Sequence, residues 1–146
     1  MKYKGLIMIV IFLVLNACDK KVKDYDKISL QNNQGDLLPL HDIESNYQVF
    51  TFLSPECPLS ENYTRTLVNF QDSLRNKGVD FYYVFPGTFY PRGQIQVFAK
   101  TYGLPIEYFL YDDDYLLRNY CKANTTPEVF LMDNKGIIYY SGAIDN

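Results

Sequence analysis

Residues 49–60 of the chain read VFTFLSPECPLS, with Cys57 at the point where an apolar, strand-like run ends and a helix-like run begins. At the N-terminus of a helix, unpaired backbone N–H groups and the positive end of the helix dipole stabilise a thiolate relative to a thiol. Cysteines in this position have pKa values lowered from about 8.5 to roughly 3.5–7.5. The sequence therefore predicts that Cys57 is a reactive thiol.

The first residues have the pattern of an export signal. Lys2 and Lys4 precede an uncharged apolar run over residues 5–15, which is too short to span a bilayer as a helix and has the length of a signal-peptide core. Residues 15–18 read LNAC, which resembles the lipobox of bacterial lipoproteins, where cleavage before the cysteine is followed by lipid attachment to it. An uncleaved anchor or an ordinary signal peptide is the alternative. We therefore expect a lipoprotein signal peptide over residues 1–17, a lipid on Cys18 that holds the protein at a membrane, and a location in the bacterial cell envelope outside the cytoplasm.

The remainder of the chain is long enough for one compact domain. Residues 18–27 are mostly charged and suit a tether, and residues 28–146 are expected to fold. Loss of Lys2 and Lys4 takes the formal net charge from −3 to −5, and no basic cluster is present, so nucleic acid is not expected as a partner.

Metal binding is not expected either. His41 is the one histidine of the chain, and no second cysteine lies near Cys57, so zinc or copper ligation would need unusual donors. Neither a metal nor another cofactor is predicted. After export, the thiols that remain are Cys57 and Cys121.

Hydrophobic patterning and turn residues predict alternating strands and helices. This order indicates an α/β domain with a mixed sheet flanked by helices. Residues 112–114 are three aspartates that provide N-cap candidates for the last helix. The expected strands cover 28–30, 37–40, 47–53, 79–85, 107–111, 128–133 and 136–141, and the expected helices cover 59–77, 94–102 and 115–122.

Three short motifs carry a family resemblance over roughly residues 28–146. Cys57-Pro58 at the first strand-to-helix junction, Thr126-Pro127 before a late strand, and GAID at residues 142–145 together resemble the redoxin branch of exported thioredoxin-like lipoproteins, within the alkyl hydroperoxide reductase/thiol-specific antioxidant superfamily. The resemblance implies a thioredoxin-like fold. That fold normally ends with a helix over the sheet, and the sequence stops at Asn146 after the last predicted strand, so we expect this helix to be missing or the sequence to be truncated.

The resemblance also implies the make-up of the site. In such proteins the proline at the position of Pro127 is cis and lies against the active cysteine. Proline offers no N–H, which leaves neighbouring backbone groups available to a bound peptide or thiol partner. Thr126 and Glu128 are then expected to flank the substrate cleft, together with Pro58 and Ser54.

The chain departs from dithiol thioredoxins at Ser60, which stands where the second cysteine of Cys-x-x-Cys would be. Its hydroxyl can hydrogen-bond the Cys57 thiolate but cannot form a disulfide. Either Cys121 or an external thiol must then resolve a mixed disulfide. Cys121 precedes Pro127 by six residues, and a bridge would need its Cα within about 7 Å of that of Cys57; the alternative is a small buried core residue.

These residues predict a thiol-disulfide oxidoreductase that acts on exported protein thiols or disulfides through a Cys57 mixed disulfide, with an unidentified thiol donor. A peroxiredoxin-type peroxidase is the first alternative. Ser54 matches the hydroxyl of the peroxiredoxin motif P-x-x-x-[TS]-x-x-C, but Phe50 stands in place of its proline and Pro127 in place of its supporting arginine. A redox-inactive binding module that keeps the fold is the second alternative.

Overall fold

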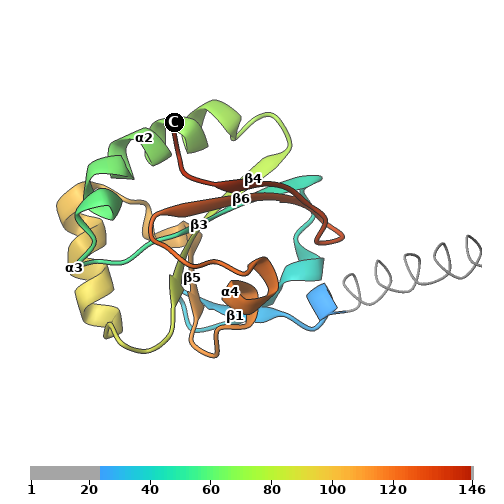
Figure 1. The fold of residues 1–146 in the computed structure, drawn as a ribbon, viewed down its shortest axis with the longest axis horizontal. Coiled ribbons are helices and arrows are strands. Elements are labelled where there is room, and N and C mark those ends of the chain that lie inside the picture. Colours follow the sequence, from blue (N-terminus) through green and yellow to red (C-terminus); the bar gives the residue numbers. More distant parts are fainter. Residues whose placement is uncertain (1–23, 146) are drawn as a thin grey trace, which may run out of the picture.

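The computed structural model describes residues 24–145, which form a seven-stranded sheet with helices on both faces (Figure 1). The strands lie in the order β2-β1-β5-β4-β3-β6-β7. They comprise β1 (Ser29–Asn32), β2 (Leu37–Pro39), β3 (Tyr47–Phe52), β4 (Val79–Pro86), β5 (Phe109–Asp112), β6 (Glu128–Asp133) and β7 (Ile138–Gly142). The helices are α2 (Pro58–Leu74), α3 (Arg92–Tyr102) and α4 (Leu116–Cys121), with short 3-10 turns at Leu40–Asp42 and Ile106–Tyr108.

The sheet is mixed, as the sequence predicted. β3, β4 and β5 are parallel neighbours, whereas β6 runs antiparallel to β3 and β1 runs antiparallel to β5. The two predicted hairpins, β1–β2 and β6–β7, occupy the two edges. The pairing of β3 with β6 places Phe52 opposite Glu128, so the ends of these two central strands meet at one edge of the sheet.

Alternate side chains of β3 enter two separate hydrophobic cores. Val49 packs with the cluster under α2 and α3, which includes Leu67 and Phe98, and Phe50 packs with the opposite cluster, which includes Leu117 of α4. Successive side chains of a strand point to opposite faces of the sheet, so a strand covered on both faces buries alternate side chains in two different cores. The sheet is therefore covered by α2 and α3 on one face and by α4 with the N-terminal segment on the other (Figure 1).

The folded domain begins earlier than the sequence predicted. Tyr25 lies within the segment expected to be a tether (18–27), yet it is completely buried and its hydroxyl donates to Oε1 of Gln48 at 2.7 Å. A single aromatic residue among charged neighbours gives no periodic signal, which explains the error at this boundary. The expected signal peptide and Cys18 lie outside the described residues.

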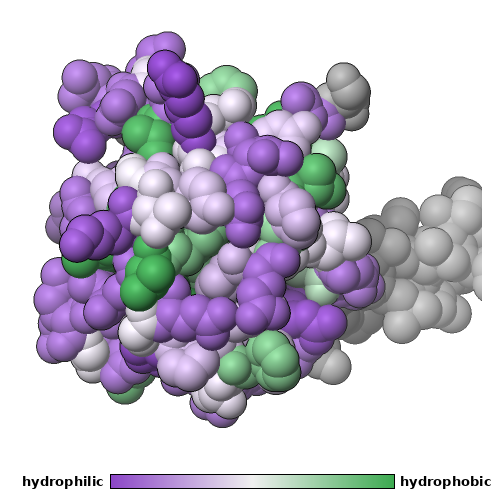
Figure 2. Space-filling model, turned by 90° about the vertical axis from the view of Figure 1, so that its left-hand side faces the viewer, coloured by the Kyte–Doolittle hydropathy of each residue, from purple (hydrophilic) through white to green (hydrophobic). Residues whose placement is uncertain are grey.

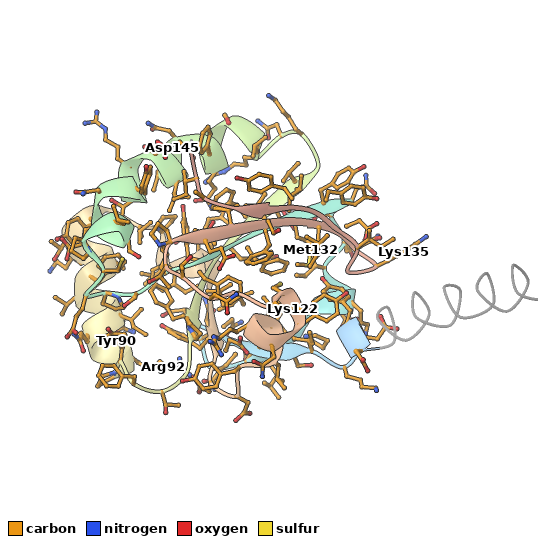
Figure 3. All side chains as sticks on the ribbon, in the orientation of Figure 1. Tyr90, Arg92, Lys122, Met132, Lys135 and Asp145 are labelled. Atoms are coloured by element: carbon orange, nitrogen blue, oxygen red, sulfur yellow. The ribbon has the colours of Figure 1, made fainter. Side chains whose placement is uncertain are left out.

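Residues 143–145 extend from β7 along α2. The Tyr63 hydroxyl donates to the Asp145 carboxylate, labelled in Figure 3, and Ile144 packs against the α2-side core. No helix follows β7 within residues 24–145. Over the same range, none of the helices has the length and apolar character needed to cross a bilayer.

Candidate active site

Cys57 is the N-cap residue of α2, and Pro58 occupies the first helical position. Proline suits this position because its φ angle is preset for the helix and no intrahelical partner is lost through its missing N–H. The Cys57 thiol is partly buried, whereas Pro58 and Leu59 beside it are exposed. The predicted helix start is confirmed, and it leaves the sulfur accessible at the edge of the sheet.

The Thr126-Pro127 peptide bond is cis, as the resemblance implied. The loop that contains it lies against Cys57, and the distance from Cys57 Sγ to the Thr126 carbonyl oxygen is 3.0 Å. The two residues are 69 positions apart in the chain and meet because β3 and β6 pair. The structure therefore brings together the two motifs on which the predicted site depends.

The pKa of the Cys57 thiol is lowered from its ordinary value. Desolvation is the largest influence and raises the pKa, but it is outweighed by stabilisation of the thiolate from the backbone N–H and hydroxyl of Ser60, from Thr126 and from the backbone N–H of Leu59. The contact with the Thr126 carbonyl opposes this effect, because a carbonyl can only accept and therefore favours the protonated thiol. The net effect is a larger share of thiolate, the form that attacks disulfides, than in an unperturbed cysteine.

Ser60 is completely buried behind Cys57. Its Oγ accepts a hydrogen bond from the backbone N–H of Ser54 at 3.2 Å, which leaves the hydroxyl proton for the sulfur of Cys57. A serine hydroxyl has one donor and two acceptor sites, so both interactions are satisfied together. Ser54 thus contributes to the site through its backbone, and Ser60 links the loop after β3 to the thiolate.

Glu128 holds the loop that precedes the cis proline. Its Oε2 accepts the backbone N–H groups of Asn124 at 2.8 Å and Thr125 at 3.2 Å. Charge-assisted hydrogen bonds to a carboxylate are stronger than neutral ones. The geometry gives Glu128 a role in positioning the loop, in addition to its predicted place beside the cleft.

Cys121 lies in the core on the α4 side of the sheet and is 7% exposed. Its electrostatic neighbours include Tyr25 and Tyr120, and the Tyr120 hydroxyl donates to the carbonyl of Gly136 at 2.6 Å. Gly136 follows the far end of β6, whereas Pro127 precedes its near end. Cys57 and Cys121 are both present as thiols.

A hollow of about 120 Å³ opens beside Thr126 and was not predicted from the sequence. It is bounded by the ends of β3 and β4 and by the segment from α4 to the cis proline. The one feature of the sequence that could have predicted this hollow is the short distance along the chain between the end of α4 and Thr126-Pro127. The lining residues are Phe52, Pro86, Arg118, Ala123, Asn124, Thr125 and Thr126.

The features of a peroxidase site are only partly present. Phe50, in the place of the peroxiredoxin proline, is a fully buried strand residue, and the cis Pro127 stands where the supporting arginine would be. Arg92 forms an ion pair with Asp113 at 2.6 Å and stacks on Tyr111, with Cζ 3.4 Å from the ring centroid. Residues 24–145 contain no group of three or more side chains able to hold a metal ion.

Comparison with known proteins agrees with this geometry. The family model described as "AhpC/TSA family" matches residues 19–141. No curated protein matches the chain.

Solved structures with the same fold include a thioredoxin-like protein from Aeropyrum pernix, with a TM-score of 0.69, 15% identity, and 91% of each chain covered. A secreted Mycobacterium tuberculosis disulfide oxidoreductase, described as homologous to E. coli DsbE, has a TM-score of 0.65 and 17% identity over 80% of this chain and 82% of that one. StoA from Bacillus subtilis has a TM-score of 0.65 and 18% identity over 78% of this chain and 84% of that one. The fold is thioredoxin-like.

Proposed function

The chain belongs to the AhpC/TSA family, and on that premise we propose that it is a thiol-disulfide oxidoreductase whose Cys57 thiolate attacks disulfides of exported proteins. The observation that carries the proposal is the placement of Cys57 at the start of α2, with a lowered pKa and within 3.0 Å of the residue before the cis proline. A stabilised thiolate at an exposed edge is the nucleophile that disulfide exchange requires.

The surface around the site suits a macromolecular partner. The side of the molecule that carries α2 and α3 is predominantly hydrophilic, with separate hydrophobic residues (Figure 2). Leu59, next to the reactive cysteine, is 55% exposed and offers an apolar contact to a partner that lies across Pro58 and Pro127.

The reaction proceeds in three exchanges. The Cys57 thiolate attacks one sulfur of a substrate disulfide, the substrate S–S bond breaks, and the released substrate sulfur leaves as a thiolate that takes a proton from solvent. An external thiol donor then attacks the Cys57 sulfur of the mixed disulfide, which releases the second substrate thiol and leaves a disulfide between Cys57 and the donor. A second donor thiol attacks the donor sulfur of that disulfide, which forms the donor disulfide and releases the Cys57 thiolate. Electrons thus flow from the donor thiols to the substrate. The same exchanges run in reverse carry electrons from a substrate dithiol to a donor disulfide.

We assign resolution of the mixed disulfide to an external thiol. Ser60 cannot form a disulfide, and Cys121 packs in the α4-side core with neighbours at the far end of β6. In this proposal Cys121 serves as a small apolar core residue.

The proposal places the protein in the cell envelope, with lipid on Cys18 and exported proteins as substrates. The pattern of the first 18 residues supports this location. One structural neighbour is consistent with it, since it is described as a secreted disulfide oxidoreductase.

Capture of mixed disulfides tests the function. The reduced wild-type protein and the variants C57S and C121A are mixed with an oxidised model protein, quenched with acid and analysed by intact-protein mass spectrometry. We expect a mixed-disulfide adduct in wild type and C121A and none in C57S.

Three outcomes would contradict the proposal in different ways. Absence of an adduct in wild type would support the redox-inactive binding module. A Cys57–Cys121 disulfide that replaces the adduct in wild type would assign resolution to Cys121. Faster oxidation of Cys57 by hydrogen peroxide than by the disulfide, trapped as a sulfenic acid with dimedone, would support the peroxidase.

A further inference from the structure

We propose that the hollow beside Thr126 is a subsite for a carboxylate on the thiol or disulfide partner, and that Arg118 is the residue that binds it. The inference rests on the proposed function and names the chemistry of its substrate: a disulfide that carries a carboxylate a few bonds from the reacting sulfur. Such a carboxylate comes either from an acidic residue beside the cysteine of a peptide or from the free acid of a small thiol.

The hollow is adjacent to the reactive sulfur. Thr126 lines it and also provides the carbonyl that lies 3.0 Å from Cys57 Sγ. Phe52 forms another wall, at the end of the strand that leads to Cys57. A partner joined to Cys57 through a disulfide can therefore reach this hollow by extending past Thr126.

Arg118 provides the positive charge in the hollow. Its side chain is partly buried, and Cζ lies 5.4 Å from the ring centroid of Tyr115, which supports the guanidinium by a cation–π contact. No ion pair involving Arg118 occurs among residues 24–145. Arg92 differs in this respect, because Asp113 neutralises it at 2.6 Å.

Asp113 pairs with Arg92, exposed Asp114 lines a different hollow, and the other two acidic residues nearest along the chain are bonded by the backbone. Asp112 accepts the backbone N–H groups of Leu117 at 3.2 Å and Arg118 at 2.8 Å, and Glu128 accepts those of Asn124 and Thr125. Both carboxylates are therefore satisfied by the backbone, and the guanidinium remains available to an added anion. Arginine pairs with carboxylates through two parallel hydrogen bonds, which gives the interaction direction as well as strength.

The size and polarity of the hollow favour a carboxylate over a large apolar group. The hollow has a volume of about 120 Å³, and its lining includes polar residues such as Arg118, Asn124 and Thr126. Thr125, whose side chain carries a hydroxyl able to donate a hydrogen bond, also lines the hollow. These features make the hollow complementary to a small anion rather than to an apolar anchor.

Two aromatic disulfides that differ in charge test the inference. Dithiobis-nitrobenzoate carries carboxylates and dithiodipyridine does not, and both release a coloured thiol when Cys57 attacks. We expect R118Q to lower the second-order rate constant for dithiobis-nitrobenzoate by about five- to tenfold, and to leave that for dithiodipyridine within about twofold. R118K keeps the charge and should retain part of the preference.

K122Q is the matched control, because Lys122 lies at the end of α4 (labelled in Figure 3) and carries the same charge but does not line the hollow. It should leave the ratio of the two rate constants within about twofold of wild type.

A second comparison uses end-blocked peptide disulfides with Glu or Gln beside the cysteine, and small thiol disulfides with a free or esterified acid. For each pair, the ratio of the rate constants of the charged and the uncharged disulfide is compared between wild type and R118Q. The pair whose ratio changes identifies the source of the carboxylate.

The outcomes separate this inference from the proposed function. A normal reaction of wild type with both reagents, and a ratio unchanged in R118Q or changed equally in K122Q, would overturn the carboxylate subsite alone. Failure of the wild-type protein to react with either reagent would overturn the proposed function, and the subsite with it.

Discussion

The reactivity of Cys57 depends on a few neighbouring groups that stabilise a negative sulfur. Ser60 contributes twice, through its backbone N–H at the start of α2 and through its hydroxyl. Because Ser60 is buried and its Oγ accepts the Ser54 N–H, the hydroxyl is held in one orientation before the thiol ionises. A serine at the position of a resolving cysteine thus removes the second redox thiol while it keeps support for the thiolate.

The rate of Cys57 alkylation by iodoacetamide should show this effect. Since only the thiolate is alkylated, the rate rises as pH passes the pKa, and a lowered pKa moves the rise to lower pH than for a free cysteine. Ser60→Ala removes one donor to the thiolate and should move the rise to higher pH. The experiment uses the C121A background so that one thiol is followed.

Ser73→Ala is the control for this measurement, because Ser73 lies on the same helix and its hydroxyl donates to the Phe70 carbonyl at 2.8 Å, far along α2 from Cys57. Its pH profile should match that of wild type. A profile for Ser60→Ala that coincides with wild type would show that the hydroxyl does not stabilise the thiolate.

At the scale of elements, local patterns predicted most of the fold. The strand-to-helix junction at Cys57, the two hairpins and Thr126-Pro127 are all recognisable within a few residues of sequence, and each is present. The start of β5 was wrong by two residues, because Ile106–Tyr108 forms a 3-10 turn whose apolar pattern resembles that of a strand. Boundaries set by hydrogen bonding rather than by hydrophobicity are the ones that sequence patterns locate least well.

Features that need distant residues were not predictable. The hollow beside Thr126 combines Phe52, Pro86 and Arg118, which come from three separate elements. From sequence alone, Arg118 is one more charge on a short helix. The burial of Ser60 and the hydrogen bond to the Ser54 N–H likewise depend on how α2 packs against the loop after β3.

Asp112 connects β5 to α4, and its removal should cost stability. The sequence placed the N-cap of this helix among residues 112–114, but the N-cap residue is Tyr115, which makes no side-chain capping bond. The Asp112 carboxylate, three residues earlier, accepts the N–H groups of Leu117 and Arg118. Asp112 is 1% exposed, and burial, its largest influence, raises the pKa of its carboxyl despite these hydrogen bonds.

We expect Asp112→Ala to lower the free energy of unfolding by about 1–3 kcal/mol, because buried N–H groups lose their acceptor. Urea unfolding followed by circular dichroism measures this. Asp114→Ala on the same turn is the control, since Asp114 is exposed and should change stability by less than about 0.5 kcal/mol. Equal losses for the two variants would contradict the capping role.

For the whole molecule, the turn after β6 joins the C-terminal hairpin to the N-terminal segment. Gly136 has a φ of +78°, and a Cβ there would lie 2.5 Å from Cγ of Tyr25 and 2.7 Å from the hydroxyl oxygen of Tyr120. Tyr25 in turn bonds Gln48 of β3. This turn therefore packs the C-terminal hairpin against the N-terminal segment, and the close approach of the two tyrosines leaves no room for a side chain at Gly136.

Gly136→Ala should be strongly destabilising, by about 2–4 kcal/mol, because it combines an unfavourable φ with overpacking against buried tyrosines. Gly93→Ala in α3 is the opposite case, since its Cβ would meet nothing within 4 Å, and it should stabilise by roughly 0.5–1 kcal/mol. Thermal unfolding of both variants beside wild type measures the difference. A Gly136→Ala protein as stable as wild type would contradict the contact.

Because Cys57 and Thr126 lie far apart along the chain, the Cys57 thiol becomes reactive towards other proteins only at a late stage of folding. Cys57 and Thr126 are 69 positions apart, and before β3 and β6 pair they are not held together. At that stage α2 also has no fixed N-terminus beside the sulfur. A newly made chain then carries a cysteine of ordinary acidity, with only a few per cent ionised at neutral pH. Cys57 therefore becomes a strong nucleophile only when the domain has folded, which limits disulfide formation with other proteins before folding. For the same reason, the rate of Cys57 alkylation also reports whether folding is complete.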